Sequence, residues 1–198
     1  MPSGSTVSEM PKRQKQGVFC LEGNWDQRNR LTSTSTVRPI LDLLAGQQQI
    51  KFIHKDVETE DELEYYIRKW LQSQYQAYNI GYLAFHGSPG AFRVGELQVS
   101  LDRLAEIIDG KGSGRILYFG SCSTLAINQE DEIKRFLKET KIKAVCGYNK
   151  DIDWIESAAF EVLLIDALAR YQRIHAANNY LQKDYANLCK RLDFRMVW

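Results

Sequence analysis

Short apolar runs alternate with amphipathic segments along most of the chain. Two of the runs, residues 80–90 (IGYLAFHGSPG) and 115–124 (RILYFGSCST), end abruptly in small residues. A short run of apolar, β-branched and aromatic residues closed by Gly, Ser or Pro is typical of an inner strand of a parallel sheet, which is covered on both faces. The pattern therefore predicts two buried strands at these places.

The rest of the chain continues the alternation. Further strands are predicted to begin at Gly17, Ile50 and Lys143, with a small hairpin over residues 92–101 and a terminal strand over residues 193–198. Apolar residues at three- and four-residue spacing predict helices over residues 38–47, 60–78, 102–109, 130–140, 154–171 and 175–190. We therefore expect an α/β fold: a doubly wound, mostly parallel sheet of five or six strands in an order near 2-1-3-4-5, with helices on both faces.

The length of the chain limits its domain organisation. With 198 residues it is long enough for one well-buried domain and too short for two. We expect a single domain over residues 17–198, preceded by a leader over residues 1–16 whose polar composition indicates disorder. The segment 24–37, after the first strand, is unusually long for a connection between a strand and a helix, and such loops are commonly functional.

The composition indicates an ordinary globular protein. The hydrophobic fraction is 44%, the charged fraction is 26% and the net charge is +1, which gives no reason to expect a nucleic-acid or membrane partner. We find neither a signal-peptide core nor a membrane-spanning run, so we expect a cytoplasmic protein. The four cysteines contain no CxxC pair, so we expect no metal and no cofactor.

A histidine and a cysteine follow the two buried strands. His86 comes after the run that begins at Ile80, and Cys122 after the run that begins at Arg115. In open α/β sheets ligands bind at the carboxyl ends of the strands, so an imidazole and a thiol there can face each other across one cleft. This is the arrangement that a cysteine nucleophile and a histidine base require. The N–H groups of Gly87 and Cys122 are the predicted oxyanion donors, and Gly87, which lacks a Cβ, leaves room for a substrate backbone.

These residues carry a resemblance to a known superfamily. A strand ending in His86-Gly87, then a hairpin, a helix and a strand ending in Ser121-Cys122, resembles the caspase-like (clan CD) cysteine peptidases, which include caspases, metacaspases, gingipains, separases and bacterial CHAT-type proteases. The resemblance covers the element order over residues 17–198. It implies a caspase-like fold and hydrolysis of peptide bonds through an acyl-enzyme on Cys122.

The sequence also departs from the known branches of the superfamily. Cys122 follows His86 by 36 residues, against roughly fifty in caspases, so the spacing favours a compact bacterial or CHAT-like member. Gly120 stands two residues before the cysteine, where caspases have Gln and metacaspases and clostripain-like enzymes have Asp. The specificity for the residue before the cleaved bond, P1, therefore cannot be taken from either branch.

Candidates for a substrate or ligand pocket come from two segments. In the superfamily the segment after the strand that follows the cysteine lines the pocket, which corresponds here to residues 147–154 (GYNKDIDW). Acidic residues would select Lys or Arg at P1 and arginines would select Asp, and both alternatives stay open. The two aspartates of this segment could equally cap the next helix. The candidates are Asp151, Asp153 and Trp154 in this segment, and Glu22, Asp26, Arg28 and Arg30 in the long first loop.

Two other enzyme classes fail on spacing. The sequence GSCST at residues 120–124 resembles the nucleophile elbow of class I glutamine amidotransferases, but these need a downstream histidine with a nearby Glu, and only His175 follows. Tyrosine phosphatases need Arg six residues after the cysteine, where this chain has Asn128.

A function of a different kind stays open. The chain could be a caspase-like binding module that senses a small anionic, nucleotide-like ligand or a protein partner, with a latent or idle dyad. The resemblance implies a regulated effector, as in bacterial antiviral defence or programmed death. The expected partners are a protein or peptide substrate, a nucleotide-like activator and, through the terminal edge strand, a second copy of the chain.

Overall fold

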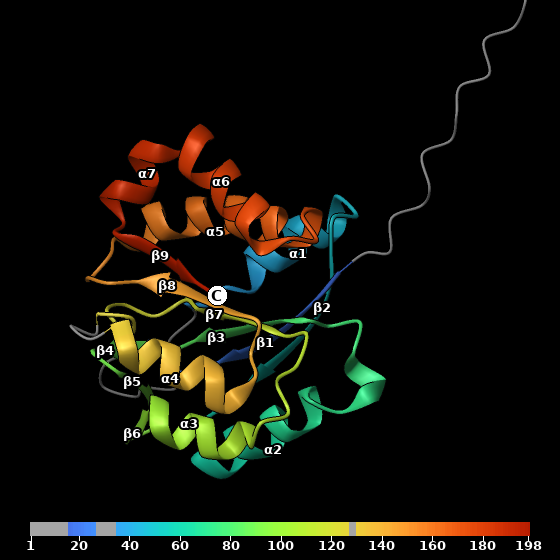
Figure 1. Cartoon of the computed structure of the whole chain (residues 1–198), viewed down its shortest axis with the longest axis vertical. Coiled ribbons are helices and arrows are strands. Elements are labelled where there is room, and N and C mark those ends of the chain that lie inside the picture. Colours follow the sequence, from blue (N-terminus) through green and yellow to red (C-terminus); the bar gives the residue numbers. More distant parts are fainter. Residues whose placement is uncertain (1–15, 27–34, 127–129) are drawn as a thin grey trace, which may run out of the picture.

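A six-stranded sheet forms the centre of this computed structural model, which describes residues 16–26, 35–126 and 130–198 (Figure 1). Its strands are, in spatial order, β2 (Lys51–Asp56), β1 (Gly17–Glu22), β3 (Ile80–Ala84), β7 (Ile116–Phe119), β8 (Ala144–Tyr148) and β9 (Phe194–Val197). The first five strands pair in parallel and β9 pairs antiparallel to β8. The predicted doubly wound, mostly parallel sheet is confirmed, together with its strand order.

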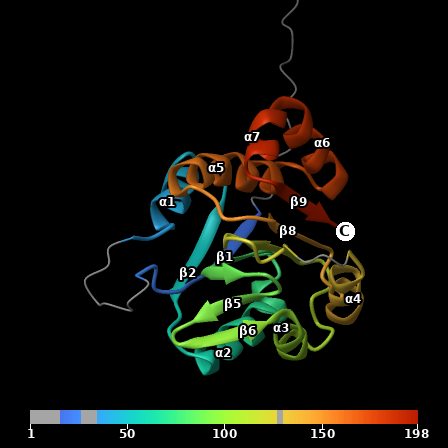
Figure 2. The same ribbon diagram turned by 90° about the vertical axis from the view of Figure 1, so that its left-hand side faces the viewer.

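Helices cover both faces of this sheet (Figures 1 and 2). One face carries α1 (Arg38–Gly46), α5 (Trp154–Arg170), α6 (Ile174–Asp184) and α7 (Ala186–Arg191), and the other carries α2 (Glu60–Trp70), α3 (Leu101–Ile108) and α4 (Glu130–Thr140). Because successive strand residues point to opposite faces, the buried side chains divide into two clusters, one on each side of the sheet. Among the described helices, none combines the length and the apolar character needed to cross a membrane.

A smaller antiparallel sheet follows β3. It consists of β4 (His86–Ser88), β5 (Ala91–Val94) and β6 (Leu97–Ser100), paired in that order. The hairpin predicted around Gly95 is confirmed: this residue has φ 56°, and a Cβ there would lie 2.3 Å from the Glu58 carbonyl oxygen. The strand predicted from Ile80 is β3, which ends at Ala84, so His86 lies just past its carboxyl end as expected. The pairing of residues 86–88 with β5 as a separate short strand was not predicted.

Two predicted helices are shorter than the apolar pattern indicated. The helix expected over residues 60–78 ends at Trp70 and is followed by the 3₁₀ turn η1 (Ser73–Tyr75). The buried Arg115 guanidinium donates hydrogen bonds to four carbonyl oxygens in this region. These hydrogen bonds satisfy the carbonyl groups where the helix ends, so no further helical turn is required. The four acceptors are Trp70, Gln72, Tyr75 and Tyr78. The helix expected over residues 175–190 divides at Tyr185 into α6 and α7.

Candidate active site

His86 and Cys122 lie at the same edge of two neighbouring strands. β3 and β7 pair in parallel, with Leu83 opposite Phe119 near their carboxyl ends, as predicted. His86 opens β4, and Cys122 lies in the turn that follows β7. Both residues are half-buried, so the strand order brings the histidine segment and the cysteine turn to one partly open edge of the sheet.

Gly87 packs directly against the cysteine turn. A Cβ at position 87 would lie 2.0 Å from the Cys122 carbonyl oxygen and 2.4 Å from Thr124 Oγ1, so a larger residue cannot fit without moving backbone. The Gly90 N–H also donates to the Thr124 carbonyl oxygen at 3.2 Å. The space left by the missing Cβ of Gly87, which was expected to admit a substrate backbone, is therefore filled by the Cys122 turn. The role of Gly87 as an oxyanion donor stays a prediction.

The cysteine turn is held by the loop between β8 and α5. The Ser123 N–H donates to the Lys150 carbonyl oxygen at 3.1 Å, and Ser123 Oγ donates to Asp151 Oδ1 at 2.9 Å. Ser123 has φ 57°, a left-handed conformation that costs a non-glycine residue about 1–2 kcal/mol. These hydrogen bonds offset the strain and fix the backbone on the carboxyl side of Cys122.

The surroundings of the Cys122 thiol raise its pKa. Burial is the main cause and the Asp151 carboxylate adds to it, while the backbone N–H groups of Ile152 and of Cys122 itself oppose the shift. The thiol is therefore protonated at neutral pH. Within the described residues, no hydrogen bond joins the His86 ring to this thiol. The resting cysteine is thus not a preformed thiolate.

Trp25, in the loop after β1, orients the His86 ring. His86 Nε2 lies 2.9 Å from the Trp25 carbonyl oxygen. Because a carbonyl only accepts hydrogen bonds, Nε2 carries the proton, and Nδ1 of the neutral ring can accept one. The Trp25 indole packs edge-on against His86 at 5.4 Å and against Trp154 at 4.9 Å between ring centroids. Trp154, a predicted pocket wall, is 41% exposed beside this aromatic group.

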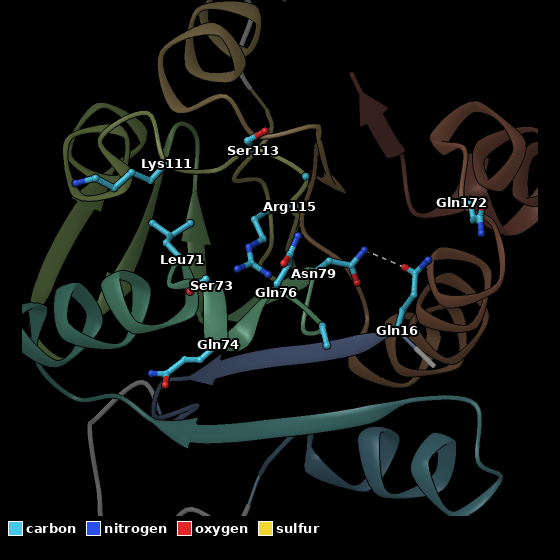
Figure 3. Close-up of a pocket in the computed structure, with 12 residues that line it drawn as sticks. Gln16, Leu71, Ser73, Gln74, Gln76, Asn79, Lys111, Ser113, Arg115 and Gln172 are labelled. Atoms are coloured by element: carbon cyan, nitrogen blue, oxygen red, sulfur yellow. Dashed lines mark hydrogen bonds between the residues drawn. The ribbon is translucent and has the colours of Figure 1, made fainter. Parts of the chain in front are cut away.

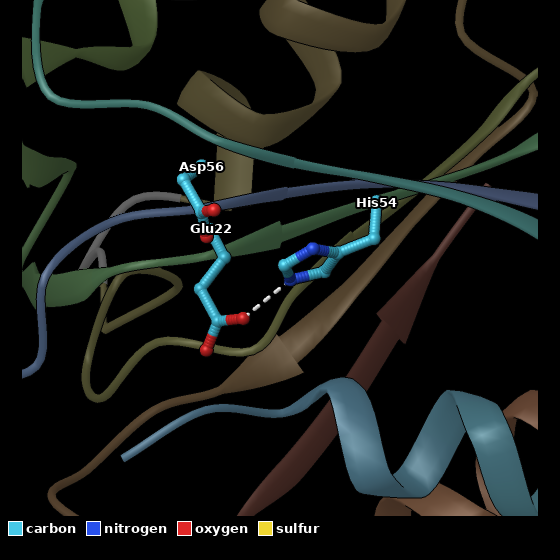
Figure 4. A group of neighbouring side chains, drawn as sticks. All are labelled: Glu22, His54 and Asp56. Carbon is cyan, nitrogen blue, oxygen red and sulfur yellow. Dashed lines mark hydrogen bonds and ion pairs between the residues drawn. The ribbon is translucent and has the colours of Figure 1, made fainter. Parts of the chain in front are cut away.

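Glu22, the last residue of β1, lies in the interior with 3% of its surface exposed. Its Oε1 accepts from Trp25 Nε1 at 2.5 Å and from the Val37 N–H at 2.7 Å, and its Oε2 accepts from Thr36 Oγ1 at 2.7 Å. Oε2 also accepts from His54 Nε2 at 2.5 Å (Figure 4). Burial alone would raise the pKa of Glu22, but these four hydrogen bonds outweigh it and lower the pKa. The buried carboxylate is therefore charged.

One group of described residues could supply three metal ligands. The ligand atoms of Glu22, His54 and Asp56 lie within 4.8 Å of one another (Figure 4). A carboxylate offers about four lone-pair positions, and four donors already occupy those of Glu22. A cation would have to displace at least one of these donors, so the arrangement fits a hydrogen-bonded carboxylate better than a metal centre.

The remaining pocket candidates have different surroundings. Asp153 caps α5, accepting from the N–H groups of Ile155 and Glu156, so the capping alternative is confirmed for this residue. Asp151 is exposed beside the cysteine turn, and Asp26 is half-buried in the first loop. Arg28 and Arg30, like the predicted leader up to residue 15, lie outside the described residues. Glu22 could meet a substrate cation only by giving up one of its four donors.

A second buried carboxyl lies near the carboxyl ends of β3 and β7. Glu161, on α5, accepts from Tyr82 Oη at 2.6 Å and from Tyr118 Oη at 2.9 Å. Burial raises the pKa of Glu161 to about 7, although both hydrogen bonds oppose the shift. Sequence reasoning did not single out Glu161, whose signal was a charge on the otherwise apolar face of a largely apolar helix. It also missed Trp25 and Ser123.

A large pocket lined by described residues lies away from the dyad. It has a volume of about 920 Å³ and sits at the amino-terminal edge of the sheet, beside Asn79 and Arg115 (Figure 3). The Arg115 cation already donates to four carbonyl oxygens, and Lys111 pairs with Asp109. Lys111, Ser113 and Gly114, from the turn before β7, form part of the rim. We therefore place the candidate chemistry at the opposite edge.

The fold and this site define an α/β protein that carries a cysteine and a histidine at the carboxyl edge of two neighbouring parallel strands. The chain belongs to a family of unknown function, DUF6642, whose family model matches residues 15–198. A comparison with curated proteins found none that matches. The matched range contains all of the described elements from β1 to β9, so both dyad residues lie within the family's extent.

Proposed function

We propose that this protein is a caspase-like cysteine endopeptidase with Cys122 as the nucleophile and His86 as the base. The observation that carries the proposal is the packing of the His86-Gly87 segment against the Cys122 turn at the carboxyl edge of the sheet. The Trp25 carbonyl supplies the third element of such a site, because it orients the base.

Because the Cys122 pKa is raised, the thiol must give up its proton during its attack on the substrate. His86 Nδ1 accepts the Cys122 proton as Sγ adds to the substrate carbonyl carbon, and the imidazolium then gives this proton to the leaving amine. Water attacks the resulting thioester with His86 again as the base, which releases the acid product and restores the thiol. The Nε2–H stays bonded to the Trp25 carbonyl throughout and stabilises the imidazolium. The Gly87 and Cys122 N–H groups are the proposed oxyanion donors.

Two exposed groups beside the cysteine turn support a substrate preference. Asp151 offers a carboxylate to a Lys or Arg side chain at P1, and Trp154 offers an apolar wall. All four cysteines are free, which supports a cytoplasmic, reducing environment. The superfamily resemblance implies a regulated effector of bacterial defence or programmed death.

A second candidate function rests on a specific observation. The thiol is protonated, and among the described residues no hydrogen bond joins it to the His86 ring. Both features suit a caspase-like module whose dyad is latent until a nucleotide-like ligand or a protein partner binds.

Labelling with peptidyl acyloxymethyl ketones tests the proposal. Probes with Arg, Lys, Asp or Leu at P1 are applied to the wild type, His86→Ala and the matched control His175→Ala, whose histidine is exposed on α6. We expect mass spectrometry to find the label on Cys122, lost in His86→Ala and retained in His175→Ala. If Asp151→Asn is no longer labelled by the Arg and Lys probes, Asp151 is assigned to the P1 site.

Two results would contradict the proposal. Labelling of Cys122 that is equal in the wild type and His86→Ala would remove the base from the mechanism. Failure of every probe to label Cys122 would favour the binding module.

A further inference from the structure

A set of hydrogen bonds runs from the buried carboxylate of Glu22 to the ring of His86. We propose that Glu22 is a positioning residue, which acts through Trp25 to hold the His86 imidazole in its productive orientation. This inference rests on the proposed function, because it adds a residue to the same site.

Trp25 is held at its indole N–H and at its carbonyl oxygen. Its indole Nε1 donates to Glu22 Oε1 at 2.5 Å, and its carbonyl oxygen accepts from His86 Nε2 at 2.9 Å. The indole ring lies between the two, packed on His86 and Trp154. A displacement of the Trp25 backbone would disturb both hydrogen bonds, so the anchoring of the indole by the carboxylate restricts where the carbonyl meets the imidazole.

The backbone around Glu22 is itself fixed. The Glu22 carbonyl oxygen accepts from the Val57 N–H at 2.8 Å, and the Gly23 N–H donates to the Ala84 carbonyl oxygen at 2.9 Å. Phe85 is the residue before His86, and a Cβ at Gly23 would lie 2.6 Å from the ring of Phe85. The carboxylate therefore projects from a rigid strand end that already touches the histidine segment.

The same carboxylate holds both described ends of the long first loop. Trp25 binds it before the undescribed residues 27–34, and Thr36 and Val37 bind it after them. His54, from the neighbouring strand β2, donates to the second oxygen and sets its direction. One side chain thus anchors the loop whose backbone orients the proposed base, although it does not touch the reacting atoms.

The conservative variant separates positioning from a general loss of structure. In Glu22→Gln, the amide oxygen can accept from Trp25 and Val37, and the amide N–H groups can donate to Thr36 Oγ1 and to His54 Nε2 when His54 carries its proton on Nδ1. All four contacts can survive without the charge. Glu22→Ala keeps none of them.

The first readout is the inactivation of Cys122 by the acyloxymethyl ketone that labels it best, resolved into kinact and KI. We expect Glu22→Ala to lower kinact by roughly tenfold to hundredfold with little change in KI, and Glu22→Gln to recover most of the loss. Trp25→Phe replaces the indole by a smaller ring without an N–H donor, so it breaks the hydrogen bond to Glu22. We expect it to lower kinact as well. The double variant Glu22→Ala, Trp25→Phe should be no slower than the slower single variant, since both changes break one connection.

Glu60 supplies the matched control. This partly exposed carboxylate binds Arg103 Nε at 2.6 Å between α2 and α3, on the face of the sheet away from α5. Glu60→Ala removes an ion pair without touching the loop, so its kinact should equal that of the wild type.

The second readout does not depend on activity. Nitrogen-15 NMR of the three histidines reports the His86 tautomer, with the proton on Nε2 in the wild type and in Glu22→Gln. A mixture of tautomers in Glu22→Ala or, should that variant not fold, in Trp25→Phe would support the inference. If Cys122 reacts and these variants keep both the wild-type kinact and the Nε2 tautomer, Glu22 is not a positioning residue and the dyad stands. If no probe labels the wild type, the proposed function fails, and the tautomer alone decides the inference.

Discussion

Glu22 and Glu161 are equally buried, each with 3% of its surface exposed, yet their surroundings drive the two carboxyls in opposite directions. Glu22 accepts hydrogen bonds from four donors, and its pKa is lowered. Glu161 accepts from two tyrosine hydroxyls, and its pKa is raised to about 7. Burial therefore does not determine the charge of a carboxyl by itself, and the number and strength of its donors do.

The two buried glutamates therefore have different roles in the fold. The Glu22 carboxylate is charged at neutral pH and holds Trp25, whose carbonyl meets the proposed base. The Glu161 carboxyl lies among the phenol groups of Tyr82, Tyr118 and Tyr148 and changes its charge near neutral pH. Replacement by glutamine should therefore stabilise the protein at position 161 above neutral pH and destabilise it at position 22.

The largest expected effect is the loss of the Glu22 side chain. Glu22→Ala leaves the buried Val37 N–H and the Trp25, Thr36 and His54 donors without their acceptor, so we expect the free energy of unfolding to fall by about 3–5 kcal/mol. Urea unfolding at pH 7 measures this change. Glu161→Ala should lose less, because Tyr118 keeps its hydrogen bond to Tyr148. A larger loss at position 161 would reverse the comparison.

Glu161→Gln is expected to stabilise the protein at pH 8. The folded-state pKa of Glu161 lies above the value of 4.5 expected for the unfolded chain. The stability from this group is therefore fully present below pH 4.5 and is lost as the pH rises through about 7. The glutamine has no charge to bury, so its unfolding free energy should exceed that of the wild type by about 2–3 kcal/mol at pH 8.

The pH profile of that difference is the decisive feature. Unfolding of both proteins is compared from pH 4.5 to pH 8, and the advantage of Glu161→Gln should grow across this window. A difference that does not vary with pH would show that Glu161 does not titrate there.

Glu22→Gln should show the opposite pH dependence on a smaller scale. Because the pKa of Glu22 is lowered in the fold, its stabilisation is present above the unfolded value of 4.5 and is lost as the pH falls through the folded-state pKa. We expect the variant to be about 1 kcal/mol less stable than the wild type at pH 7. Acid unfolding followed by circular dichroism should show this deficit shrinking below pH 4.5. A deficit that persists in acid would have to come from packing.

Asp151 extends the comparison to an exposed carboxylate, and its effect should be the smallest. Its charge adds to the raised pKa of the Cys122 thiol. Asp151→Asn should therefore move the pH profile of Cys122 alkylation by iodoacetamide to lower pH, while the wild-type rate still rises at pH 9. Asp42→Asn, on the exposed side of α1, is the control. Identical profiles for the wild type and Asp151→Asn would show that the Asp151 charge does not affect the pKa of the Cys122 thiol.

The sheet could be predicted because each strand and helix is recognisable from the hydrophobic pattern of its own residues. Buried strands, connecting helices and chain order were enough to bring His86 and Cys122 to one edge, since parallel strands align their carboxyl ends. The same reasoning predicted the N-cap role of Asp153 as an alternative to substrate binding.

The partners of each site residue could not be predicted in this way. The contact between Trp25 and His86 joins residues 61 apart, and it depends on the path of a loop with no periodic pattern. Glu22 ends a strand covered on both faces, so its position alone did not show whether its carboxylate faces solvent or the interior. The pairing of β4 with β5 could not be predicted either, because the three residues of β4 (HGS) are too few to carry an alternating pattern.

The most direct test of the account is cleavage of a diverse peptide library, read by mass spectrometry of the new termini. Wild type, Cys122→Ala and His86→Ala are incubated with the same library. We expect new termini that share a P1 class in the wild type and are absent from both variants. An identical peptide pattern for the wild type and Cys122→Ala would contradict it.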